Sequence, residues 1–124
     1  MNVPNIRLGK RKRKKVPMIE EITPVQAKEW LENDEAILID VREQDEWDEG
    51  RISYASHAPL SRFHELVETL EIPEGKHIIF QCLAGGRSMK AAQFFEQHIQ
   101  PDNDIYNMAG GIKVWKGLGL PVEK

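Results

Sequence analysis

Apolar residues fall into short runs that alternate with segments of helical spacing. Residues 36–41 and 77–81 are the most continuous apolar runs, as is typical of central parallel strands buried on both faces. Shorter runs predict further strands at 16–22, 56–60 and 104–108. Helical spacing predicts helices over 23–33, 44–50, 61–72, 89–99 and 110–115. Strands therefore alternate with helices along the chain, which favours an α/β fold: a central parallel sheet with helices on both faces.

Two helix starts carry capping signals. Thr23 precedes Pro24 and is followed by Gln26, which is the pattern of a capping box with proline at the first helical position. Ser61 is expected to cap the helix over 61–72, which the segment Pro-Glu-Gly at 73–75 would end.

Charge divides the chain into two parts. Residues 1–16 hold seven basic residues and no acidic one. The remaining 108 residues therefore carry a net charge of −10, whereas the whole chain carries −3. We expect residues 1–16 to form a basic, disordered leader and residues 17–124 to form one domain. The leader could lie against its own acidic domain or a neighbouring copy, or bind an acidic partner such as RNA or anionic lipid. No aromatic residues interleave its basic residues to support nucleic-acid recognition.

The chain has a single cysteine and no long apolar segment. A lone cysteine excludes an internal disulfide and a four-cysteine zinc site, and it favours a reducing compartment, most simply the cytoplasm. No apolar run is long enough to span a membrane, and no signal-peptide core follows the N-terminal charges.

Cys82 lies between the predicted strand 77–81 and the helix that follows. A thiol in this position faces unpaired backbone N–H groups and the positive end of the helix dipole, which lower its pKa and favour the nucleophilic thiolate. Gly85 and Gly86 allow the loop to curl so that successive N–H groups point at an anion. The alternative is a small buried apolar side chain. The adjacent Gly-Gly-Arg favours the nucleophile.

Four spaced motifs give the chain a family resemblance. They are Leu-Ile-Asp-Val-Arg-Glu at 38–43, Glu46 with Gly-Arg-Ile at 50–52, Cys-Leu-Ala-Gly-Gly-Arg-Ser at 82–88, and Gly110-Gly111 with Trp115, Gly119, Pro121 and Val122. In this order they resemble the rhodanese (thiosulfate sulfurtransferase) family in its single-domain form, over about residues 19–122.

The resemblance implies a sulfurtransferase in which Cys82 carries a persulfide. The backbone of Leu83, Ala84, Gly85, Gly86 and Arg87 would surround the outer sulfur. The donor would be thiosulfate or a persulfide, and the acceptor cyanide, a thiol or a protein. No cofactor or metal is implied.

The neighbouring residues have supporting interpretations. Arg87 would either orient an anionic donor or brace the loop by bonding carbonyls and a carboxylate. Asp40 and Arg42 are interpreted as an ion pair or turn brace, Ser88 as a helix cap, and Trp115 as a core aromatic residue.

Two departures refine the prediction. The loop from Cys82 to Arg87 is one residue shorter than that of protein tyrosine phosphatases, which suits a single sulfur atom better than a phosphate. Leu83 stands where many family members have a basic or polar residue, which weakens the case for thiosulfate as donor. Two alternatives remain open: a non-turnover module that carries sulfur or binds a partner, and a redox sensor in which Cys82 is oxidised.

Overall fold

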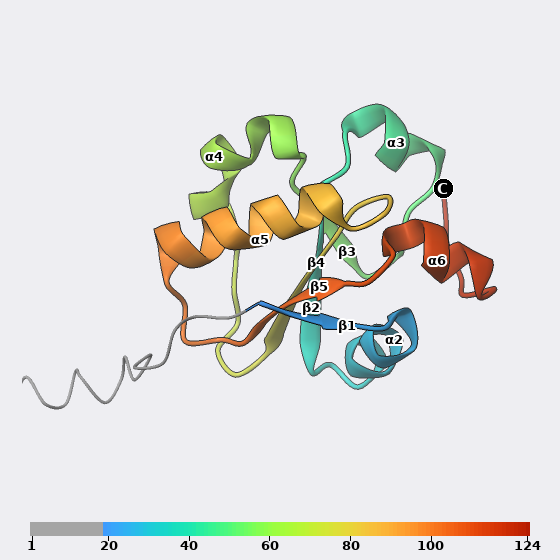
Figure 1. Cartoon of the computed structure of the whole chain (residues 1–124), viewed down its shortest axis with the longest axis horizontal. Helices are drawn as coiled ribbons and strands as arrows, with labels where there is room; N and C mark the ends of the chain where they lie inside the picture. Colours follow the sequence, from blue (N-terminus) through green and yellow to red (C-terminus); the bar gives the residue numbers. More distant parts are fainter. Residues whose placement is uncertain (1–18) are drawn as a thin grey trace, which may run out of the picture.

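A five-stranded parallel sheet forms the centre of the molecule (Figure 1). The computed structural model describes residues 19–124, so the predictions for the basic leader lie outside the described residues. The strands lie in the order β1-β5-β4-β2-β3, and all neighbours are parallel. Their bounds are β1 Glu20–Ile22, β2 Ala36–Asp40, β3 Ala55–His57, β4 His77–Gln81 and β5 Ile105–Met108. The predicted α/β fold with a parallel sheet is confirmed.

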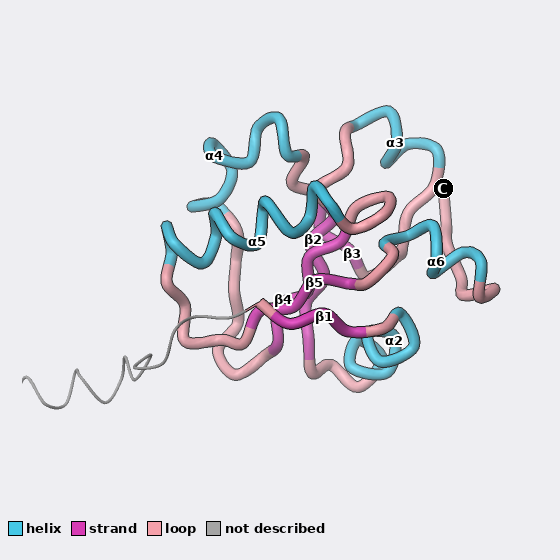
Figure 2. Tube along the Cα trace, viewed as in Figure 1, coloured by secondary structure: helices cyan, strands magenta, loops and turns pink. Residues whose placement is uncertain are grey.

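Helices cover both faces of the sheet. They are α2 Pro24–Glu32, α3 Gln44–Glu49, α4 Phe63–Leu66, α5 Gly86–Ile99 and α6 Gly111–Gly117. Figure 2 shows α4 and α5 on the opposite side of the strands from α2. One apolar cluster joins Phe63 of α4 and Phe95 of α5 to the sheet, and a second joins Leu31 of α2 and Trp115 of α6 to the other face. The two apolar clusters explain why the central strands read as nearly continuous apolar runs.

The central strands bring two distant loops together. β2 pairs with β4 from Ala36 opposite His77 to Asp40 opposite Gln81. Because the two strands are parallel and in register, the loops that follow Asp40 and Gln81 leave the same edge of the sheet. The first of these loops leads into α3, and the second contains Cys82.

The two predicted caps have different outcomes. Thr23 is the N-cap of α2, where its hydroxyl oxygen accepts a hydrogen bond of 3.1 Å from the N–H of Gln26. The prediction for Ser61 is wrong, because Ser61 lies inside a 3-10 turn, Leu60–Arg62. Its hydroxyl donates to Glu43 over 2.6 Å instead of capping a helix. The expected helix is in fact that turn, then α4, then a second 3-10 turn, Val67–Thr69.

Trp115 is a core residue, as predicted. It is 1% exposed, and its indole N–H donates to the carbonyl oxygen of Pro121 over 2.9 Å. Within residues 19–124, no helix is long and apolar enough to cross a membrane.

Candidate active site

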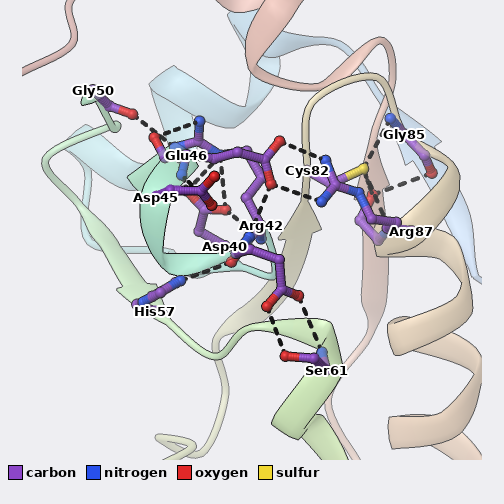
Figure 3. Close-up of polar contacts among 12 residues, drawn as sticks. Asp40, Arg42, Asp45, Glu46, Gly50, His57, Ser61, Cys82, Gly85 and Arg87 are labelled. Carbon is purple, nitrogen blue, oxygen red and sulfur yellow. Dashed lines mark hydrogen bonds and ion pairs between the residues drawn. The ribbon is translucent and has the colours of Figure 1, made fainter. Parts of the chain in front are cut away.

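Cys82 directly follows β4 and precedes α5, at the carboxyl edge of the sheet (Figure 3). Gly85 is the N-cap of α5, and its φ of 113° is one that glycine adopts readily. This backbone conformation turns the chain from the strand into a 14-residue helix within a few residues. The helix therefore directs its N-terminal N–H groups and the positive end of its dipole at the Cys82 side chain.

The sulfur atom of Cys82 is surrounded by hydrogen-bond donors. The N–H of Gly85 lies 3.1 Å from Sγ, and the N–H and hydroxyl of Ser88 each lie 3.4 Å from it. Burial raises the pKa of the Cys82 thiol, but the bonds from Ser88, Gly85 and Ala84 outweigh burial and leave the pKa below its ordinary value. The loop is thus organised to hold a negative charge on sulfur.

Helix α6 fixes the orientation of the loop backbone. The N–H of Ile112 donates to the carbonyl oxygen of Cys82 over 2.9 Å, and the N–H of Lys113 donates to that of Leu83 over 3.0 Å. These two carbonyl groups of the loop are therefore bonded to α6. The contact with α6 therefore helps to set the path of the loop that carries Cys82.

Ser88 is part of the sulfur's surroundings and not the cap of α5. The prediction of a cap is wrong because Gly85 occupies that position and Ser88 is the third residue of the helix. The single proton of the Ser88 hydroxyl is shared between Sγ and Oδ1 of Asn107, to which the hydroxyl donates over 2.5 Å; the amide N–H₂ of Asn107 donates to the carbonyl of Gly85 over 3.1 Å. Asn107 is buried in β5 and was missed from the sequence. The signal for Asn107 that the sequence did offer was a polar residue within a short apolar strand.

Arg87 is held by a carboxylate. Its Nη1 and Nη2 atoms donate to the two carboxylate oxygens of Glu46 over 2.8 and 2.9 Å (Figure 3). This pairing lowers the pKa of Glu46 to about 2 and raises the pKa of Arg87. The contact with a carboxylate is one part of the bracing interpretation, and a role of Arg87 in orienting a donor stays a prediction. Glu46 belongs to the second sequence motif, but its pairing with Arg87 was not foreseen.

Asp40 and Arg42 form the expected ion pair, buried beside the loop. Nη2 of Arg42 donates to Asp40 over 2.9 Å, and the exposed side-chain fractions are 5% and 0%. Arg42 also donates to the carbonyl oxygens of Gly50 over 2.7 Å and Glu46 over 3.2 Å. The pair therefore fastens α3 to the end of β2, and α3 in turn presents Glu46 to Arg87.

The remaining loop residues differ in their surroundings. Leu83 is 45% exposed beside the buried Cys82. Gly86 begins α5, where a Cβ atom would meet nothing within 4 Å. Among residues 19–124 there is no group of three or more His, Cys, Asp or Glu side chains placed to hold a metal ion.

Comparisons with known proteins identify the family. A model of the rhodanese-like domain matches residues 23–118. YtwF of Bacillus subtilis (strain 168), which carries a sulfurtransferase name, is 36% identical over 104 residues, covering 83% of this chain and 96% of that protein. Thiosulfate sulfurtransferase GlpE of Actinobacillus pleuropneumoniae is 34% identical over 108 residues, covering 83% and 92%.

A solved structure supports the same assignment. The rhodanese-related protein of Thermoplasma volcanium superposes with a TM-score of 0.72 at 29% identity, covering 84% of this chain and 97% of that one. The chain therefore belongs to the family of rhodanese-like domains. This confirms the resemblance and the fold class inferred from the four sequence motifs.

Proposed function

We propose that this protein is a sulfurtransferase that moves sulfane sulfur from a donor to a thiophilic acceptor through a persulfide on Cys82. The observation that carries the proposal is the set of donors around Sγ, from Gly85 and from both the backbone and hydroxyl of Ser88. The names of relatives such as YtwF and GlpE support the same reaction class.

The reaction divides into two displacements at sulfur. The Cys82 thiolate forms a bond to the outer sulfur of the donor, and the donor's own bond to that sulfur breaks. The electron pair of the broken bond leaves with sulfite when the donor is thiosulfate, and with a thiolate when the donor is a persulfide. In the second step a thiol or cyanide attacks the outer sulfur of Cys82–S–S⁻ and regenerates the thiolate.

The loop stabilises each anion in this cycle without a general base. The lowered pKa of Cys82 increases the share of the nucleophilic thiolate at a given pH. The backbone N–H groups of the loop from Leu83 to Arg87 and the N-terminus of α5 stabilise the anionic outer sulfur of the persulfide. The Asp40–Arg42 pair supports the loop through α3. A reducing compartment, most simply the cytoplasm, suits a reaction that depends on a free thiol.

The experiment that tests this function is production of thiocyanate from cyanide, with thiosulfate and with an alkyl persulfide as donor. The native protein is expected to produce thiocyanate with at least one of them. Cys82→Ser is expected to produce none while keeping its circular dichroism spectrum, because a serine hydroxyl is nearly isosteric with the thiol but stays protonated. Thiocyanate production by the serine variant, or none by the native protein, would contradict the proposal.

A further inference from the structure

The only ionisable side chain between residues 83 and 88 is Arg87, and Glu46 occupies it. The two side chains meet through two hydrogen bonds, with 32% of the arginine side chain and 29% of the glutamate side chain exposed. In a pairing of this kind the two opposite charges largely cancel, so the paired guanidinium attracts an incoming anion less than an unpaired one would. The positive charge of Arg87, which could attract an anionic donor, is therefore balanced by Glu46 within the protein.

Glu46 is held rigidly in its position. The N–H of Glu43 donates to Oε1 of Glu46 over 2.9 Å as part of a capping box at the start of α3. Arg42, itself paired with buried Asp40, donates to the backbone carbonyl of Glu46. Because both the backbone and the carboxylate of Glu46 are fixed, the pairing with Arg87 is built into the fold rather than formed by chance contact between two long side chains.

The loop places this pair in electrostatic range of the nucleophile. The negative charge of the Cys82 thiolate contributes to the raised pKa of Arg87, so the guanidinium and the sulfur interact. Figure 3 shows the Glu46–Arg87 pairing and the Cys82 sulfur in the same site, and Arg87 directly precedes Ser88, whose N–H lies 3.4 Å from Sγ. The residue that follows Cys82 in the sequence is Leu83, whose side chain is apolar and 45% exposed.

We propose that Glu46 is a specificity-determining residue for sulfur transfer: by neutralising Arg87, it disfavours doubly charged donors such as thiosulfate relative to singly charged or neutral persulfides and thiosulfonates. This rests on the sulfurtransferase function proposed above. It deepens that function by naming the charge class of the donor. A thiolate that attacks a dianion meets stronger repulsion than one that attacks a monoanion, and an unpaired arginine would relieve that repulsion.

Two donors that differ by one charge make the test specific. Thiosulfate is a dianion and releases sulfite, whereas methanethiosulfonate is a monoanion and releases methanesulfinate. In both reactions the Cys82 thiolate forms a bond to the outer sulfur as the bond from that sulfur to the oxidised sulfur breaks. The ratio of the two kcat/KM values, measured with cyanide as acceptor, therefore reports how strongly the site discriminates against the second negative charge of the donor.

Glu46→Gln is the informative variant because it removes the charge and keeps one acceptor. The Gln carbonyl can occupy the Oε1 position, which binds both the N–H of Glu43 and Nη1 of Arg87. Glu49→Gln is the matched control, since Glu49 is an exposed residue at the end of the same helix and its loss changes the net charge equally.

Glu46→Gln is expected to raise the ratio of thiosulfate to methanethiosulfonate kcat/KM by about threefold or more, mainly through a lower KM for thiosulfate. The gain should shrink as ionic strength rises, because the freed charge is partly exposed. Glu49→Gln should leave the ratio within about 1.5-fold of the native value.

The outcomes separate the two proposals. A parallel loss of activity toward both donors, or an unchanged ratio, would show that Glu46 only braces the loop and would overturn its role in specificity. If the native protein and the Glu46→Gln variant both fail to transfer sulfur from these two donors and from an alkyl persulfide, the sulfurtransferase function itself is contradicted.

Discussion

The backbone N–H of Ile112 donates to the carbonyl oxygen of Cys82 over 2.9 Å, which joins the N-terminus of α6 to the loop that holds the sulfur. The preceding residue, Gly111, makes this approach possible. A Cβ atom at Gly111 would lie 2.4 Å from the carbonyl oxygens of both Cys82 and Leu83, and the φ of Gly111 is 62°. The surroundings of Cys82 thus depend on a residue 29 positions later in the sequence.

Gly111→Ala is expected to destabilise the protein by about 2 kcal/mol or more, because the methyl group clashes with two carbonyls in a conformation unfavourable to alanine. It should also slow sulfur transfer by disturbing the loop. Gly117→Ala is the control in the same helix, where a Cβ atom would meet nothing within 4 Å. Urea unfolding of both variants is the measurement. Equal stabilities would contradict the close contact between α6 and the loop.

Ser88→Ala is expected to raise the pKa of Cys82, since the variant loses the hydroxyl that contacts Sγ and keeps the N–H. Because the pKa of Cys82 is lowered from its ordinary value, the rate of alkylation of the native protein rises with pH through that lowered pKa and levels off above it. In the variant the same rise moves to higher pH. The rate of iodoacetamide alkylation as a function of pH measures both values. Ser56→Ala, at an exposed position of β3, should leave the profile in place. A profile unmoved by Ser88→Ala would exclude this role of the hydroxyl.

Arg42→Met is expected to cost about 3–5 kcal/mol of folding free energy, because it leaves the carboxylate of Asp40 buried without its cation. Arg62→Met provides the comparison. Arg62 pairs with Glu65 over 3.2 Å, with exposed side-chain fractions of 62% and 56%, so its loss should cost less than about 1 kcal/mol. Thermal and urea unfolding of the two variants test the difference. Similar losses would mean that the buried pair has no special structural role.

Local signals in the sequence located the elements and the cysteine loop. Strand β4 was predicted at residues 77–81 and is observed over His77–Gln81, because its apolar residues are contiguous and end at a polar residue and a glycine-rich loop. Helix α3 was predicted at residues 44–50 and spans Gln44–Glu49. The placement of Cys82 between a strand end and a helix N-terminus followed from the same local pattern.

The partners across the site could not be predicted in this way. Glu46 and Arg87 are 41 residues apart, and Ser88 and Asn107 are 19 apart. Each contact depends on strand order, because β2 and β5 lie on either side of β4 and carry α3 and Asn107 to the loop. The same reason explains Ser61, whose hydroxyl was expected to cap a local helix but bonds to Glu43, 18 residues earlier.

The most direct test of the account is the mass of the intact protein after incubation with thiosulfate, methanethiosulfonate or an alkyl persulfide, before and after addition of cyanide. The account predicts a gain of one sulfur atom, located on Cys82 by peptide mapping, that cyanide removes as thiocyanate appears. Cys82→Ser should gain none. An intact protein that gains no sulfur from any of the three donors, or that gains oxygen on Cys82 instead, would contradict sulfur transfer and favour a binding module or a redox sensor.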